Sequence, residues 1–274
     1  MAKISNEDRH QYYEKIKPYK SAIQSLLKQE EIVLKTIKQE PRGAVFKRLT
    51  LAEEMITLAS HYIIMSGVSL SMLKLRSEEA LNDGRKSLYK GVIYLEEVVS
   101  PLVDVPYSDY EERLLEIAPI DAQKRYSLIR KMGLAIQLLE AAYGDNTKWR
   151  WAFVELEGRF AAVAKNIIDL KAAVANTDPR SPEYEPTICH LRMIKKLLHQ
   201  AADRYREKYE LSTNRIDDFK IGIHFLNALK RIHILIGERS EAETLKKKSE
   251  IWAAKLEVDM KRQEEEAVKR FSNA

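Results

Sequence analysis

Cysteine, glycine and proline are all scarce in this sequence, and their scarcity argues against several classes of protein. Cys189 is the only cysteine, so no disulfide can form within the chain, and a reducing, cytoplasmic location is the simplest expectation. The nine glycines are scattered and form neither a dinucleotide-binding nor a P-loop signature. The sequence therefore favours neither a disulfide scaffold nor a nucleotide-phosphate loop.

The chain also lacks a strong excess of charge of one sign. Its 46 Lys and Arg residues nearly balance 41 Asp and Glu residues, which leaves a net charge of +5. Nucleic-acid-binding proteins usually gather their positive charge into one stripe. Here both signs alternate within the same segments, which predicts solvated helical faces and leaves nucleic-acid binding as an alternative.

One segment has no charged residue at all. Residues 55–73 are nineteen positions without Lys, Arg, Asp or Glu, a length that could just span a bilayer. However, the segment holds six polar residues, including His61, and histidine is costly in lipid. We therefore expect no membrane span, and instead a central helix that is buried on nearly all sides.

Apolar residues recur throughout at helical spacing, and convincing strand alternation is absent. The sequence predicts an all-α protein: an antiparallel multi-helix bundle of about eight to nine helices, most of them long, with short loops. The expected organisation is an N-terminal bundle over 1–176, a Pro-containing loop or linker over 177–186, and a three-helix segment over 187–274. The last segment could pack on the first as one domain.

Several helix boundaries follow from individual residues. Ser5 and Asp8 form a capping box for the first helix, and its apolar stripe is interrupted only at Glu30. Pro18 should either kink this helix or mark the start of a second one. Longer helices are expected over 49–76, 148–176, 187–211, 214–237 and 241–271. The pair that joins at Gly237 resembles a tetratricopeptide-type hairpin through four residues: Leu229, Gly237, Ala242 and Leu245. That resemblance implies a helix pair of this shape and a peptide-binding groove.

Metal and cofactor sites are not indicated. A structural zinc site needs four convergent ligands, whereas Cys189 and His190 differ by about 100° around one predicted helix. We expect Cys189 to be a small buried thiol beside a surface imidazole, and we expect no metal and no cofactor.

One pair of residues suggests catalysis. Arg192 and His199 lie seven positions apart, so both fall on one helix face. This spacing is similar to the Arg–His pair of the HEPN helical ribonucleases, although Met193 follows the arginine where that family usually has a polar residue. The resemblance implies metal-independent RNA cleavage, with His199 as general acid or base and Arg192 stabilising the phosphorane.

Two basic clusters are candidates for a phosphate or acidic-peptide groove, because guanidinium and ammonium groups bind such ligands. The multi-helix build resembles phosphopeptide adaptors such as the 14-3-3 proteins in architecture alone. One cluster lies on the helix after residue 77 and the other after residue 187, and their members are Arg85, Lys86, Tyr89 and Lys90, and Arg192, Lys195 and Lys196.

Two tryptophans in the segment KWRWAF point in different directions. Trp149 begins an apolar seam that continues through Phe153 and Phe160, which predicts a core anchor. Trp151 points about 200° away, in line with Gly158, either against a further helix or outward as a contact residue.

The leading hypothesis is a non-catalytic helical scaffold or adaptor that binds a protein or peptide partner, with self-association as an open alternative. The competing hypothesis is a nucleic-acid-binding protein or the helical ribonuclease above.

Overall fold

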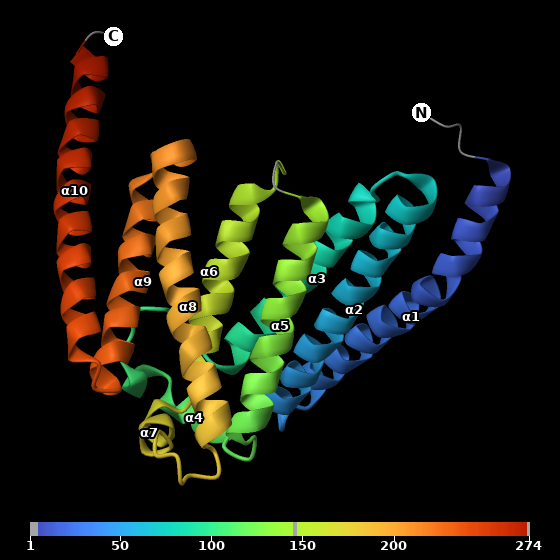
Figure 1. Ribbon diagram of the computed structural model, residues 1–274, viewed down its shortest axis with the longest axis horizontal. Coiled ribbons are helices and arrows are strands. Elements are labelled where there is room, and N and C mark those ends of the chain that lie inside the picture. The colour runs from blue at the N-terminus through green and yellow to red at the C-terminus, as the bar shows by residue number, and fades with distance from the viewer. Residues whose placement is uncertain (1–4, 145–146, 273–274) are drawn as a thin grey trace. The chain divides into compact units, whose positions relative to one another are not determined.

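The computed structural model describes residues 5–144 and 147–272, and within them it contains ten α-helices and no strand (Figure 1). The prediction of an all-α protein with mostly long helices is confirmed. The chain forms two compact units, Met1–Pro101 with Glu112–Leu156 and Leu102–Glu111 with Glu157–Ala274. The division falls inside one helix, between Leu156 and Glu157.

The bounds of the elements are as follows: α1 Asn6–Gln39, α2 Ala44–Leu73, α3 Glu78–Val98, the 3₁₀ turn η1 Tyr107–Asp109, α4 Glu111–Glu116, α5 Ala122–Tyr143, α6 Arg150–Asn166, α7 Leu170–Ala175, α8 Tyr184–Lys208, the π-helical turn η2 Tyr209–Thr213, α9 Ile216–Leu235 and α10 Arg239–Ser272.

In the first unit, α2 packs against α1, α3 and α5 and is the central helix. Its length and apolar composition would also allow it to cross a membrane, but the core helix of a soluble protein has the same properties. The expectation that it is buried on nearly all sides is only partly right. Met55 and Leu58 are buried, whereas Ile64 and Leu70 are 41% and 53% exposed, because the neighbouring helices leave one face of its C-terminal half uncovered.

The charged residue that interrupts the apolar stripe of α1 has a buried partner. The Glu30 carboxylate is 4% exposed and accepts a hydrogen bond of 2.9 Å from Lys90 Nζ and another from the Tyr94 hydroxyl, both on α3. Two donors replace the water that the carboxylate loses on burial. Burial and the carboxylate together raise the pKa of the Tyr94 hydroxyl, so it remains a donor over the physiological range.

Pro18 lies inside α1, which runs without a break from Asn6 to Gln39 and bends in its N-terminal half (Figure 1), so Pro18 does not start a second helix. The helix expected over 148–176 is two helices, because Asp169 starts a new one: its carboxylate accepts the backbone N–H groups of Lys171 and Ala172. Residues 177–186, the expected linker, lie inside the second unit, where Asn176 bonds to both Ser181 and Glu183.

The second unit depends on a close approach at Gly158. A Cβ atom added there would lie 2.6 Å from the Tyr205 ring and 3.3 Å from the Phe225 ring, so only glycine admits these side chains of α8 and α9. The small-residue face of α6 therefore receives further helices at Gly158, which is one of the two alternatives that the sequence left open for the positions in line with Trp151.

The last two helices form the expected hairpin. Gly237 has φ +79° at the turn, a conformation that suits glycine, and Leu229, Ala242 and Leu245 are buried between or beside the helices. The helix pair predicted from the tetratricopeptide-like spacing is thus present.

We predict that Glu30→Ala lowers the free energy of unfolding by about 2 kcal/mol, because it leaves the buried Tyr94 hydroxyl without an acceptor. Glu30→Gln should lose less, since the amide oxygen still accepts that bond. Urea unfolding measures both, with Glu31→Ala at an exposed neighbouring position as the control. Equal stability of Glu30→Ala and the control would contradict the role of this contact.

Candidate functional site

The first basic cluster is engaged in contacts within the first unit. Arg85 donates to Asn82 and lies 4.2 Å from the Trp149 ring centroid, while Lys86 pairs with Asp83. The Tyr89 hydroxyl donates to the Ala152 carbonyl and Lys90 to Glu30. These contacts stabilise the unit, and the groove proposed for these cations stays a prediction.

The tryptophans are placed differently from the expectation. Trp149 precedes α6 and is half-buried beside Arg85 and Lys148, so its role as a buried core anchor is wrong. The seam itself begins at Phe153, which is fully buried against Tyr143. Trp151 is also half-buried, with the Arg150 guanidinium 4.9 Å from its ring centroid.

The second basic cluster lies on α8 in the other unit. Lys195 pairs with Glu238 at 2.8 Å, whereas Arg192 and Lys196 are exposed. His199 Nε2 lies 3.5 Å from Lys248 Nζ and 3.6 Å from the Asp203 carboxylate. Within the part of the chain described, no hydrogen bond or ion pair joins Arg192 to His199, so the ribonuclease hypothesis stays a prediction.

The expected arrangement of Cys189 and His190 is reversed. Cys189 is partly exposed, while His190 is 2% exposed and its Nε2 lies 3.0 Å from the Ala164 carbonyl. That carbonyl is in the last turn of α6, where backbone carbonyls have no N–H partner within the helix. The imidazole N–H is the donor that it lacks. In residues 5–144 and 147–272, no three His, Cys, Asp or Glu side chains are grouped to hold a metal ion.

The C-terminal helix α10 has two faces with different roles, and we take it as the candidate site. Its inner face packs against α9 and η2 through buried residues at helical spacing: Ala242, Leu245, Ser249, Trp252 and Asp259. Trp252 packs on Phe219 of α9 with ring centroids 5.6 Å apart, and Phe219 stacks on Tyr209 at 4.9 Å.

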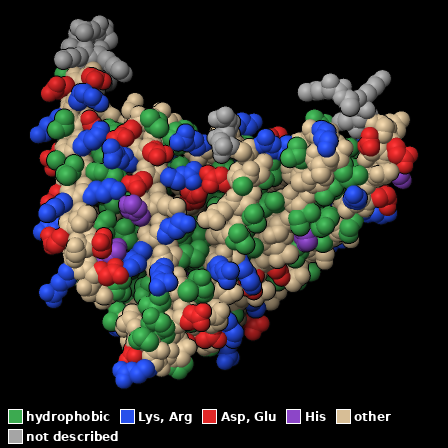
Figure 2. Space-filling model, viewed as in Figure 1, with side chains coloured by type: hydrophobic (Ala, Val, Ile, Leu, Met, Phe, Trp, Pro, Cys, Tyr) green, Lys and Arg blue, Asp and Glu red, His purple; other side chains and the backbone are tan. Residues whose placement is uncertain are grey.

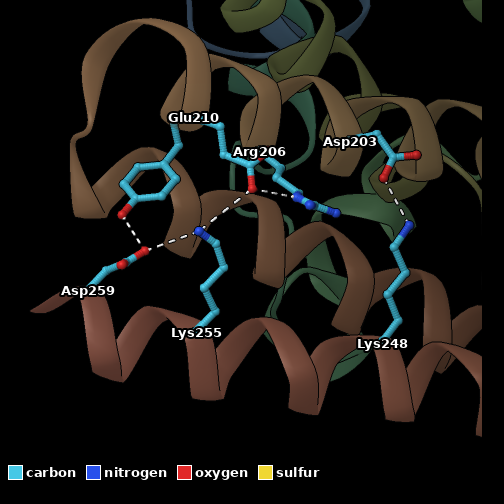
Figure 3. Close-up of polar contacts among 7 residues, drawn as sticks. Asp203, Arg206, Glu210, Lys248, Lys255 and Asp259 are labelled. Carbon is cyan, nitrogen blue, oxygen red and sulfur yellow. Dashed lines mark hydrogen bonds and ion pairs between the residues drawn. The ribbon is translucent and has the colours of Figure 1, made fainter.

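A polar network continues this inner face, as Figure 3 shows. The Tyr209 hydroxyl donates to Asp259 at 2.7 Å, and Lys255 lies 3.3 Å from Asp259 and 3.8 Å from Glu210. The hydrogen bond from Tyr209, together with Lys255 and Arg262, lowers the pKa of Asp259. Burial and the bond to Asp259 raise the pKa of Tyr209 to about 12.

The π-helical turn η2 places Tyr209 in this network, and sequence reasoning missed it. The Asn214 N–H donates to the Tyr209 carbonyl at 3.0 Å, five residues back, and Asn214 itself adopts φ +48°. The Thr213 hydroxyl and Lys208 Nζ both donate to the buried Asp218. The only sequence signal is the Ser-Thr-Asn run, which indicates a helix end but not a wider turn.

The opposite side of α10 is exposed and partly apolar. Ile251 and Val258 are 69% and 66% exposed, and Ala254 lies between them on the same side. Exposed Lys247 and Glu265 lie at the two ends of this line, so the set falls within about 60° around the helix axis. We call Lys247, Ile251, Ala254, Val258 and Glu265 the α10 outer face. Figure 2 shows basic and acidic side chains interleaved along this helix.

Comparison with known protein families identifies the family of this chain. A family model matches residues 8–260, which is most of both units. The chain belongs to the TP0443 family. No curated protein and no solved structure matches this TP0443-family chain.

The second unit of this TP0443-family chain also contains a buried lysine. Lys165 is 3% exposed, its Nζ lies 5.1 Å from the Tyr110 ring centroid, and no carboxylate among the described residues pairs with it. Burial lowers the pKa of Lys165 to about 8. Its position in the last turn of α6, near the negative end of the helix dipole, partly offsets that cost.

We predict that Lys165→Met stabilises the protein at pH 7. A folded pKa of about 8, against 10.5 in the unfolded chain, disfavours the folded state by about 3 kcal/mol while the amine is charged in both states. The increase in the free energy of unfolding should become smaller between pH 8 and 10.5 and vanish above that range. Urea unfolding at both ends of the range tests this, with exposed Lys196→Met as the control; a gain independent of pH would contradict it.

We predict that Asp259→Asn weakens the attachment of α10. Because the folded pKa of Asp259 lies below its ordinary value of 3.8, its contribution is present above that pH and is lost as pH falls through the folded pKa. The variant should lose about 1 kcal/mol at pH 7 and approach wild type in strong acid. Thermal unfolding across this range tests it, with exposed Glu257→Gln as the control.

Proposed function

We propose that this TP0443-family chain is a helical scaffold that binds a protein partner on the α10 outer face, and that the bound element is an amphipathic α-helix. The observation that supports this most is the line of exposed Ile251, Ala254 and Val258 on a helix whose other side packs against α9. Apolar residues at this spacing match the seam through which two helices pack.

The charges on the α10 outer face indicate the chemistry of the partner helix. Lys247 lies at one end of the apolar line and Glu265 at the other. A helix that carries an acidic residue opposite Lys247 and a basic residue opposite Glu265 would form two favourable pairs. Such pairs add little affinity at an exposed rim, but they select orientation and register.

The exposed apolar residues of α5 lack this combination. Leu134 and Leu138 on α5 are 54% and 51% exposed and one turn apart. They form a shorter line without opposite charges at both ends that would define a partner, so the α10 outer face is the better-specified surface.

We predict that a synthetic amphipathic peptide with a leucine seam, glutamate opposite Lys247 and lysine opposite Glu265 binds the protein. Fluorescence anisotropy of the labelled peptide measures this. Val258→Glu should weaken binding at least tenfold, because it places a charge inside the apolar seam.

Ile234→Glu is the matched control, since Ile234 is 58% exposed on α9 and lies outside the α10 outer face. The proposal is contradicted if the peptide does not bind, or if both variants weaken binding equally.

A further inference from the structure

The α10 outer face is complementary to itself when two helices run in opposite directions. If two copies are aligned so that residue 256 of one faces residue 256 of the other, Lys247 lies opposite Glu265 and Ala254 opposite Val258. By symmetry each of these pairs occurs twice, because a two-fold axis relates the copies. All four residues are exposed in the structure and belong to one side of α10.

We propose that the partner helix is α10 of a second copy of this chain, paired antiparallel through the α10 outer face. This inference rests on the proposed function and names its partner. The apolar line Ile251, Ala254 and Val258 forms the seam, with Ala254 giving room for Val258 of the other copy. Two Lys247–Glu265 ion pairs flank the seam, one at each end.

Charge selects this orientation over the parallel one. In a parallel pair at the same register, Lys247 would face Lys247 and Glu265 would face Glu265, and like charges at such positions disfavour pairing. Opposite signs therefore meet at both ends of the antiparallel seam.

The geometry of the surrounding unit leaves this face available. Trp252 and Asp259 point to the opposite side of the helix and are 4% and 7% exposed. Gln263 Nε2 donates to the Asn214 carbonyl at 2.9 Å, so the helix is held against η2 nearly as far as Glu265. A single helix pair is at the small end of stable interfaces, which predicts a dissociation constant of roughly micromolar order.

Sedimentation equilibrium of the full chain, from low micromolar to submillimolar concentration, tests the proposal. Wild type should change from monomer to dimer with concentration, and added salt should weaken the dimer. Lys247→Glu and Glu265→Lys should each weaken it by about tenfold, because two ion pairs become two repulsions. The double variant should restore the dimer, and a mixture of the two single variants should form a heterodimer.

Lys246→Glu is the matched control: it makes the same change of charge one residue away, on a side of α10 that does not face the seam. It should leave dimerisation unchanged. Circular dichroism spectra and melting curves of all variants should coincide, since every substituted residue is exposed.

Spin labels test the orientation. With Cys189→Ser as background and Thr244→Cys as the labelling site, the labels of an antiparallel pair lie about 36 Å apart along the helix axis. In a parallel pair they would lie about 10 Å apart, the usual distance between packed helices. Double electron–electron resonance distinguishes the two.

A wild-type chain that stays monomeric over the whole range would overturn the self-pairing. So would a dimer that Lys247→Glu does not weaken, or one with the short label distance. If the chain is monomeric but the designed peptide still binds, the α10 outer face keeps its proposed function with another partner. If neither occurs, both proposals fall.

Discussion

The packed rings of Tyr209, Phe219 and Trp252 hold the C-terminal part of the second unit together. Their centroids lie 4.9 and 5.6 Å apart, and they come from η2, α9 and α10 respectively. Buried aromatic rings contribute large apolar area, and their packing adds to it. The orientation of α10 follows from this packing, because Trp252 fixes which side of the helix faces inward and hence which side remains exposed.

Polar contacts make that orientation specific. Asp259 would be costly to bury alone, but it accepts from the Tyr209 hydroxyl and lies beside Lys255. In the first unit, buried Glu30 is likewise stabilised by hydrogen bonds from Lys90 and Tyr94. Lys165 is the exception, since it has an aromatic ring and a helix end as neighbours in place of a carboxylate.

The sequence predicts the long helices well because their apolar spacing and end residues act locally. Ser5 caps the first helix as its position predicts, and Ser77 and Asp121 cap α3 and α5 in the same way. It does not predict which charges are internal: Glu30 pairs with Lys90 and Arg85 lies on the Trp149 ring, far along the chain in both cases, and no local pattern encodes those contacts. Cys189 and His190 were reversed for the same reason, because the Ala164 carbonyl that receives the imidazole belongs to another helix. The α10 outer face was also missed, since its residues resemble an ordinary solvated face until the burial of Trp252 shows which side is outside.

The π-helical turn limits where the chain can tolerate an inserted or deleted residue. Removing one residue from Tyr209–Thr213 would restore α-helical geometry but rotate everything after it by about 100°. Tyr209 and Thr213 could then not both keep Asp259 and Asp218 as partners. By contrast, the exposed segment around Arg180 joins two helices in a loop, where extra residues cost little. Insertions and deletions among related chains should therefore collect near residue 180 and be absent from the turn.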